Sequence, residues 1–202
     1  QYPVCLLHGY TASGKTELYI HLIKDCIEQG KQALMLVPEI ALTTQLAYRL
    51  KRVFGDELGI YHSGLNVRER LDVWRQVGRQ NGCKVVLGAR SAVLLPYHNL
   101  GLVVVDEEHD SSYKQQDPAP RYHARNAAMV LAARHGAKTL LGTATPSLES
   151  YAHCKAGRYG LAELFFRYAD ASLPRVEAVD TKDLKRRKKM KSLLSPPLLE
   201  AM

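Results

Sequence analysis

The sequence predicts an α/β fold with a central, mostly parallel β-sheet flanked by helices. Short apolar runs rich in Val, Leu and Ile alternate along the chain with longer segments of helical periodicity. Near-continuous apolar strands are typical of parallel sheets, because the connecting helices bury such sheets on both faces. Ligands of these sheets bind beyond the carboxyl ends of the strands. The functional residues are therefore expected in the loops that follow the strands.

The individual elements can be placed from these runs. The expected strands cover residues 4–8, 33–37, 58–62, 84–88, 102–106 and 138–142. The expected helices cover residues 16–30, 41–53, 66–78 and 122–134. After about residue 165 the pattern weakens. It predicts one more strand over 173–180 and a helix that begins at Ser195, before two prolines.

Composition excludes several classes of protein. Of the 202 residues, 46% are hydrophobic and 24% are charged, as in ordinary globular domains. No apolar run approaches the roughly 20 residues of a membrane span, and the first residues lack a signal-peptide pattern. Because Cys5, Cys26, Cys83 and Cys154 form no C-x-x-C pair, neither a zinc site nor a disulfide framework is expected. We expect a cytoplasmic protein with reduced thiols and no membrane association.

The net charge of +8 is concentrated in one segment. Residues Thr181 to Lys191 include seven basic side chains and one acidic side chain. Such a run is either a solvated linker or a nucleic-acid contact, and the sequence does not choose between them. It gives no indication of a basic groove across the rest of the chain.

A glycine-rich loop follows the first expected strand. Residues 9–16 read GYTASGKT and match G-x-x-x-x-G-K-[ST], between a strand and a helix as this motif requires. Backbone N–H groups of such a loop bind phosphate oxygens. Lys15 is expected to reach the β- and γ-phosphates, and the Thr16 hydroxyl group to bind Mg²⁺. The other positions expected to contact the nucleotide are Gly9, Thr11, Ala12, Ser13 and Gly14.

Three acids and a histidine stand at the end of the buried strand over 102–106. A parallel sheet brings this strand end to the same edge as the phosphate loop. Asp106 is then expected to bind Mg²⁺, and Glu107 to orient or deprotonate the attacking water. Helix capping is the alternative role for acids here, and it suits Glu108 or Asp110 better than Asp106.

Five motifs together resemble those of superfamily 2 helicases. In the order and approximate spacing of motifs I, Ia, Ib, II and III they are GYTASGKT, LVPEIALTTQ, GARSAVLLP, DEEH and GTATPS. The residues of these motifs are similar to those of the bacterial replication-restart DNA helicases, and the resemblance extends from Pro3 to about Leu199. Ala12 departs from the pattern, because glycine is common at this position. We expect only a small change in the freedom of the loop backbone.

The resemblance implies a RecA-like P-loop NTPase domain that uses ATP and Mg²⁺. Residues 1–180 would form the first RecA-like lobe, and residues 181–202 a basic connector and the start of a second lobe. The intact helicase would be a monomeric 3′ to 5′ motor of replication restart and primosome assembly. Its partners would be single-stranded and forked DNA, primosome proteins and single-stranded DNA-binding protein. The isolated lobe would be nearly inactive, because the second lobe supplies an arginine to the transition state.

The resemblance also implies contacts with DNA. Motifs Ia and Ib hold one nucleic-acid backbone, here through Thr43, Thr44 and Arg90. An aromatic-rich loop after the acidic motif stacks on single-stranded bases. The residues of this loop that are suited to stacking are Tyr113, Arg121, Tyr122 and His123. From the residues alone, the two motifs also fit ordinary loop-to-helix junctions, and the loop fits a surface loop with locally packed tyrosines.

In helicases the motif GTATPS couples the nucleotide site to the nucleic-acid site. Thr143 and Thr145 are expected to hydrogen-bond with the acidic motif through His109. His109 thereby joins Lys15, Asp106 and Glu107 in the expected catalytic set. Without the resemblance, a simple strand-to-helix turn at Pro146 is the favoured interpretation.

Two alternative functions remain open at this stage. One is another superfamily 2 translocase, such as a restriction-type motor or an RNA helicase. The other is a P-loop NTPase that does not act on nucleic acid. DNA-stimulated ATP turnover would separate them.

Overall fold

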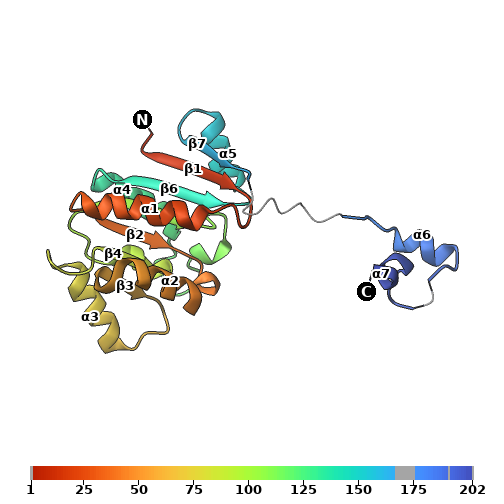
Figure 1. Ribbon diagram of the computed structural model, residues 1–202, viewed down its shortest axis with the longest axis horizontal. Helices are drawn as coiled ribbons and strands as arrows, with labels where there is room; N and C mark the ends of the chain where they lie inside the picture. The colour runs from red at the N-terminus through yellow and green to blue at the C-terminus, as the bar shows by residue number, and fades with distance from the viewer. Residues whose placement is uncertain (1, 167–175, 191, 202) are drawn as a thin grey trace. The chain divides into compact units, whose positions relative to one another are not determined.

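The computed structural model describes residues 2–166, 176–190 and 192–201. The chain divides into two compact units, Gln1–Ala169 and Asp170–Met202. The first unit contains a seven-stranded β-sheet with helices on both faces (Figure 1). Within the described ranges, no helix is long and apolar enough to span a bilayer.

All neighbouring strands of the sheet run parallel. In chain order they are β1 (Val4–Gly9), β2 (Gln32–Leu36), β3 (Leu58–Tyr61), β4 (Val85–Gly88), β5 (Leu100–Asp106), β6 (Lys138–Thr143) and β7 (Gly160–Leu164). Across the sheet the order is β3-β4-β2-β5-β6-β1-β7. The predicted parallel sheet is confirmed, and the six predicted strands are present with small shifts at their ends.

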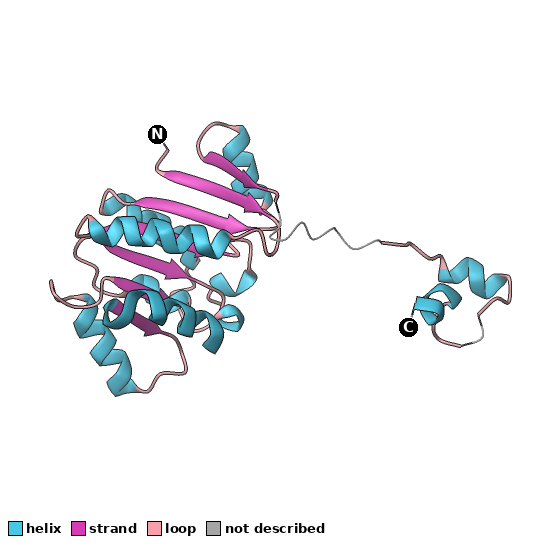
Figure 2. Cartoon of the chain, viewed as in Figure 1, coloured by secondary structure: helices cyan, strands magenta, loops and turns pink. Residues whose placement is uncertain are grey.

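Helices cover the two faces of the sheet (Figure 2). The apolar side chains of α1 (Lys15–Glu28) and α2 (Thr44–Phe54) pack on one face. Those of α3 (Val67–Val77), α4 (Ala124–Arg134) and α5 (Leu148–Lys155) pack on the other. Short 3-10 turns occur at Glu39–Ala41, Gly55–Glu57, Arg90–Leu94 and Ser111–Tyr113.

Local signals explain where several helices begin. Asn66 precedes α3 and forms a capping box, in which its side chain accepts from the Glu69 N–H at 3.0 Å. The Glu69 carboxylate in turn accepts from the Asn66 N–H at 2.8 Å. A cap of this kind is worth about 1 kcal/mol. Thr43 and Ser147 cap α2 and α5 in the simpler one-sided way.

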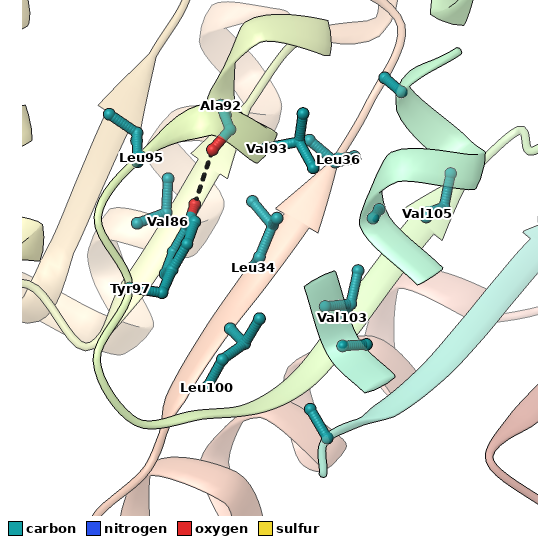
Figure 3. Packing of buried hydrophobic residues seen from close by; sticks show 14 of the residues in the cluster. Leu34, Leu36, Val86, Ala92, Val93, Leu95, Tyr97, Leu100, Val103 and Val105 are labelled. Carbon is teal, nitrogen blue, oxygen red and sulfur yellow. Dashed lines mark hydrogen bonds between the residues drawn. The ribbon is translucent and has the colours of Figure 1, made fainter. Parts of the chain in front are cut away.

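Alternate side chains of the central strands enter two apolar layers. Val103 and Val105 of β5 lie in the layer that includes α4, and Val104 between them lies in the layer that includes α1. Figure 3 shows the first layer, in which the buried Tyr97 hydroxyl group donates to the Ala92 carbonyl oxygen at 3.0 Å. Full burial of one such valine contributes about 1.5–3 kcal/mol. Packing in both layers holds the central strands in place, and so it also holds the positions of their carboxyl ends.

The strand order places three loops beside one another. β6 lies between β5 and β1, with Asp106 beside Gly142 and His8 beside Thr143. Because parallel strands end at the same edge, the loops after β1, β5 and β6 open at one place. This place holds the phosphate loop, the acidic motif and the motif GTATPS.

Two elements of the first unit were not predicted, namely α5 and the edge strand β7. Leu161, Ala162 and Glu163 of β7 are exposed, so their apolar and polar side chains show no burial pattern to detect. Of the predicted strand over 173–180, residues 173–175 lie outside the described residues. Residues 176–180 form no strand, so this prediction is wrong for the part that can be judged.

The second unit contains α6 (Thr181–Arg186) and α7 (Pro196–Ala201). The Asp180 side chain caps α6 by accepting from the N–H groups of Lys182 at 2.9 Å and Asp183 at 3.0 Å. The first part of the basic run is therefore helical. The helix predicted to begin at Ser195 is present as α7. The boundary of the lobe at residue 180 stays a prediction.

Candidate nucleotide and nucleic-acid sites

The glycine-rich loop connects Gly9, the last residue of β1, to Lys15, the first residue of α1. Gly14 precedes the helix with φ 89°, a left-handed conformation that glycine adopts without steric cost. Among the described residues, no side chain caps α1. The first N–H groups of the helix are therefore available to an anion, at the positive end of the helix dipole.

A lysine and a serine of this loop are buried polar groups. Lys15 is 9% exposed, and its Nζ donates to the carbonyl oxygens of Gly9 at 2.9 Å and Tyr10 at 3.0 Å. The Ser13 hydroxyl group is buried and has no hydrogen-bond partner in the described part of the chain. An unpaired buried hydroxyl is costly, so an incoming acceptor is favoured. These groups fit the phosphates of a nucleotide.

Ala12 has φ 62°, in the left-handed region. A residue with a Cβ loses about 1–2 kcal/mol in this conformation, and glycine avoids the loss. The substitution of alanine for the usual glycine therefore strains the loop backbone, in addition to the small change in freedom expected from the sequence.

Two buried tyrosines hold Asp106 at the end of β5. The Tyr19 hydroxyl group donates to Asp106 Oδ1 at 2.9 Å, and the Tyr113 hydroxyl group donates to the Asp106 carbonyl oxygen at 2.6 Å. A Cβ on Gly142 would lie 1.7 Å from the Tyr19 hydroxyl oxygen, so glycine is required where β6 passes this ring. Tyr19 escaped the sequence prediction because a tyrosine on an amphipathic helix is ordinarily a core residue.

The pKa values of both acids at the strand end are raised. Burial raises the pKa of the Asp106 carboxyl group, and the Tyr19 hydrogen bond and the Lys15 charge oppose this only in part. The pKa of Glu107 is also raised, first by burial and then by the negative charge of Asp106. A divalent cation beside such a pair would stabilise both carboxylates. The acids are therefore suited to Mg²⁺.

The phosphate loop and the acids share one cavity of about 610 Å³. Its lining residues are Thr11, Ala12, Ser13, Gly14, Lys15, Thr16, Glu17, Arg49, Asp106 and Glu107. The predicted Mg²⁺ ligands Thr16 and Asp106 thus face the same space. Arg49, which was not predicted, forms an ion pair with Glu17.

The structure contains no cluster of three or more His, Cys, Asp or Glu side chains suited to a metal in its described ranges. Mg²⁺ does not need one, because in nucleotide sites it usually takes one or two protein ligands and completes its shell with water and substrate phosphates.

His109 connects the acidic motif to the loop after β6. Its Nδ1 lies 2.8 Å from Thr143 Oγ1, and its Nε2 lies 3.3 Å from Thr145 Oγ1. The Glu107 carboxylate is 3.6 Å from the same Nδ1. The predicted hydrogen bonds of the two threonines with His109 are confirmed. Their role in coupling stays a prediction.

Glu108 follows Glu107 in the chain, and its fully buried carboxylate contacts the N-terminus of α5. It accepts from the Ser147 N–H at 2.8 Å, the Ser147 hydroxyl at 3.1 Å and the Ser150 hydroxyl at 2.9 Å. Arg125 donates to it through Nη1 at 2.7 Å. Burial alone would raise the pKa of Glu108, but these hydrogen bonds hold it below the usual glutamate range. Ser147 is the N-cap residue of α5, so Glu108 holds the cap residue and does not itself cap the helix. The capping role considered for Asp110 is confirmed at the turn Ser111–Tyr113, where its side chain accepts from the Ser112 N–H at 2.7 Å.

Arg90 ties motif Ib to the loop after the acidic motif. Its Nη1 donates to the carbonyl oxygens of Ser112 at 3.1 Å and Lys114 at 3.3 Å. A cavity of about 250 Å³ lies at this junction. Its lining residues are Val37, Glu39, Ser63, Arg70, Ala89, Arg90, Ser91, Ser112, Tyr113 and Gln115. One nitrogen of the Arg90 guanidinium group is therefore engaged within the protein, and contact of Arg90 with a nucleic-acid phosphate stays a prediction.

Thr43 and Thr44 stand at the N-terminus of α2. The Thr43 hydroxyl oxygen accepts from the Leu46 N–H at 3.3 Å, and both threonines are exposed. In the part of the chain that the structure describes, neither hydroxyl group donates a hydrogen bond, and a helix N-terminus favours an anion. Contact with a nucleic-acid phosphate is compatible with this arrangement and stays a prediction.

The loop after the acidic motif closes on itself. Lys114 and His123 form an antiparallel bridge, and the Gln115 N–H donates to the Tyr122 carbonyl oxygen at 2.9 Å. Arg121 is exposed, whereas Tyr122 and His123 are half-buried. These three residues stay candidates for contact with bases.

Tyr113 does not fit the stacking role predicted for it. Its ring is 0% exposed, and its hydroxyl group is engaged with Asp106. No ring face is available to a base, so the prediction is wrong for this residue. Tyr113 instead supports the acidic strand end.

Known proteins resemble this chain in both sequence and fold. Residues 3–153 match the DEAD/DEAH box helicase family. The chain belongs to this helicase family. Replication restart protein PriA of Bacillus subtilis is 44% identical over 202 residues, which are 100% of this chain and 25% of that protein. PriA of Haemophilus influenzae is 44% identical over 201 residues, which are 100% of this chain and 27% of that protein.

The helicase chain thus spans about a quarter of the length of the curated relatives it matches. Among solved structures, RecG bound to a three-way DNA junction superposes with a TM-score of 0.63 at 19% identity. The match covers 92% of this chain and 24% of RecG. The predicted RecA-like P-loop NTPase fold is confirmed.

Replacing Tyr19 by phenylalanine should weaken the nucleotide site of this helicase domain. Tyr19→Phe removes a hydrogen bond to a charged group, so the free energy of unfolding should fall by about 1.5–3 kcal/mol. The pKa of Asp106 should rise further. As the pH is lowered, the strengthening of nucleotide binding by Mg²⁺ should therefore be lost at a higher pH than in the parent. Urea unfolding and fluorescent-nucleotide binding with and without Mg²⁺ would measure both effects.

Tyr97→Phe is the matched control, because it also loses one buried hydrogen bond, but to the Ala92 carbonyl oxygen and not to an acid of the site. It should cost about 0.5–1.5 kcal/mol and leave Mg²⁺-dependent binding unchanged. Equal loss of Mg²⁺ dependence in both variants would contradict the role of Tyr19.

Glu108 should make the free energy of unfolding of the domain depend on pH in the acidic range. Its folded pKa is depressed, so its contribution is fully present above the ordinary glutamate pKa and is lost as the pH falls through the lower folded pKa. Glu108→Gln should therefore be less stable than the parent near neutrality, with a difference that shrinks in acid. Urea unfolding of both proteins across this pH range would show it. A constant difference would contradict the assignment.

Proposed function

We propose that this chain is the ATP-binding lobe of an ATP-dependent DNA helicase that moves 3′ to 5′ and acts in replication restart and primosome assembly. The observation that carries the proposal is the shared cavity, in which the phosphate loop faces Asp106 and Glu107. The identity of 44% with PriA over the whole chain supports the choice of DNA restart among the activities of helicases.

The phosphate loop would bind the triphosphate. N–H groups at the start of α1 would donate to phosphate oxygens. Lys15 now donates to two carbonyl oxygens of its own loop, and its Nζ would turn to the β- and γ-phosphates when ATP is present. Ser13 would give its buried hydroxyl group an acceptor. The loop therefore exchanges internal hydrogen bonds for contacts with the nucleotide.

The acids would carry out the hydrolytic step. Thr16 and Asp106 would hold Mg²⁺, which neutralises the charge that develops on the phosphate oxygens. Glu107 would orient the attacking water and accept its proton, a role that its raised pKa favours. Tyr19 keeps the Asp106 carboxylate directed by a hydrogen bond.

His109 and its two threonine partners would link this step to DNA. Thr143 and Thr145 lie at the end of β6, beside the strand that ends in Asp106. The loop with Arg121, Tyr122 and His123 follows the acidic motif in the chain and would contact single-stranded bases.

The further parts of the proposal concern the intact protein. It would bind single-stranded and forked DNA, primosome proteins and single-stranded DNA-binding protein, as a cytoplasmic monomer. ATP turnover with forked DNA, single-stranded DNA, RNA and no nucleic acid would separate a DNA helicase from an RNA helicase and from an NTPase that ignores nucleic acid. Stimulation by RNA alone, or by neither polymer, would overturn the proposal.

Substitution of the phosphate lysine and the catalytic acids should separate binding from hydrolysis. In the intact protein, Lys15→Ala should lose nearly all nucleotide binding and turnover, because the buried ammonium group is removed. Glu107→Gln keeps the shape of the side chain, so it should still bind Mg-ATP and fail to hydrolyse it. Asp106→Asn should instead weaken the Mg²⁺-dependent part of binding. Nucleotide fluorescence and phosphate release would measure each effect, and indistinguishable acid variants would refute the division of roles.

Removing the side chains of the loop should uncouple DNA from ATP turnover. A variant with Arg121, Tyr122 and His123 all replaced by alanine should lose about 1–3 kcal/mol per base contacted. Stimulation of ATP turnover by DNA should fall more than DNA affinity, because the loop adjoins the acids. Tyr113→Phe is the control, since the buried ring remains and only its hydrogen bond to Asp106 is lost. It should keep DNA affinity, and a triple variant with normal stimulation would return the loop to a surface role.

A further inference from the structure

The hydrolytic scheme gives no task to Glu108, although it follows the catalytic acid directly. Its carboxylate is 0% exposed. A buried charge is retained at a high cost unless it is fully hydrogen-bonded. Glu108 meets this condition with four hydrogen bonds, from Ser147, Ser150 and Arg125. So complete a set of partners for a residue beside the catalytic acid points to a positioning role.

Arg125 is the charged partner in this arrangement. It is 6% exposed and lies in the first turn of α4, two positions after His123. Its Nη1 donates to Glu108 at 2.7 Å and to the Ser147 hydroxyl at 3.1 Å. Its Nη2 donates to Glu149 at 2.6 Å. One guanidinium group therefore joins the acidic motif, the start of α5 and the end of the aromatic-rich loop.

The backbone of Glu107 explains what these contacts are needed for. Glu107 has φ 46°, a left-handed conformation that is unfavourable for a residue with a Cβ. On one side the Tyr113 hydroxyl group holds the Asp106 carbonyl oxygen at 2.6 Å. On the other side the Glu108 N–H donates to the Gly142 carbonyl oxygen at 3.1 Å. A strained residue between two fixed neighbours cannot relax unless one of them is released.

We propose that Glu108 and Arg125 form a buried ion pair whose task is to position Glu107, by anchoring the residue that follows it to α4 and α5. This inference rests on the proposed role of Glu107 in orienting water. Through Arg125 the same pair gives the end of the aromatic-rich loop a direct mechanical connection to the catalytic acid. Neither residue touches the nucleotide cavity, so each is a positioning residue.

The pair should therefore affect the chemical step and not the binding of nucleotide. Loss of the anchor lets Glu107 leave its left-handed conformation, and the water is then misplaced. Misplacement of about an ångström can lower a rate by roughly 100-fold. Affinity for Mg-ADP should stay normal, because the phosphate loop and Asp106 are unchanged. Affinity for Mg-ADP with aluminium fluoride, which mimics the transferring phosphoryl group with its water, should fall in parallel with kcat.

The experiment compares four variants of the intact protein. Glu108→Gln keeps the shape of the anchor, and Arg125→Met removes the guanidinium group while filling much of its space. The double variant Glu108→Gln with Arg125→Met removes both charges, so no unpaired charge is left in the core. Glu149→Gln is the matched control, because it removes an ion pair of Arg125 on the exposed side and leaves the anchor of Glu108 intact.

We expect both single variants to lose thermal stability and to lose about 10- to 100-fold in kcat with little change in KM for ATP. The double variant should regain stability and remain slow. Glu149→Gln should keep kcat near that of the parent. If kcat returns together with stability in the double variant, the pair is only structural and the inference is overturned. Parental kcat in a folded single variant would also overturn it.

Glu107→Gln separates this inference from the proposed function. If Glu107→Gln hydrolyses ATP at the parental rate, the role of Glu107 fails and so does the proposed mechanism. If Glu107→Gln is inactive while the Glu108 and Arg125 variants are fully active, the mechanism stands and only the positioning role fails.

Discussion

The parallel pairing of β6 with both β5 and β1 is the constraint on which the site depends. It fixes Asp106 beside Gly142 and His8 beside Thr143. The carboxyl ends of β1, β5 and β6 therefore lie next to one another at one edge of the sheet. A shift of one residue in either pairing would turn each side chain of the shifted strand to the opposite face. In β5 it would exchange the faces of Val103, Val104 and Val105 and would move Asp106 away from Gly142. The register of the sheet therefore sets the height of the acids above the phosphate loop.

Buried polar contacts also help to hold the acidic motif in place. Tyr19 reaches Asp106 from α1, and Tyr113 reaches it from the turn that follows the acidic motif. Glu108 is held from α4 and α5 in the same way. The acidic motif is thus supported from both faces of the sheet. This support explains how Glu107 keeps a left-handed backbone that an isolated residue of its kind avoids.

The sequence predicted the parts of this structure that depend on pattern. Apolar runs located six strands, and the glycine-rich loop and DEEH located the cavity. It could not predict Tyr19, because the hydrogen bond to Asp106 arises only when α1 packs across β6. Arg125 escaped for the same reason. Tyr113 was misassigned because an aromatic residue in a polar segment suggests exposure, and only the folded chain shows that its ring turns inward. β7 gave no signal, since an exposed edge strand has no buried face.

The contact between Tyr19 and Gly142 also bears on how this chain can change over evolutionary time. Any side chain at position 142 would collide with the tyrosine hydroxyl group. A smaller residue at position 19 would make room but would withdraw the donor from Asp106. The two positions, one in the first motif's helix and one in the last motif, can therefore drift only together. A lineage that loses the glycine must also find another way to direct its metal-binding carboxylate.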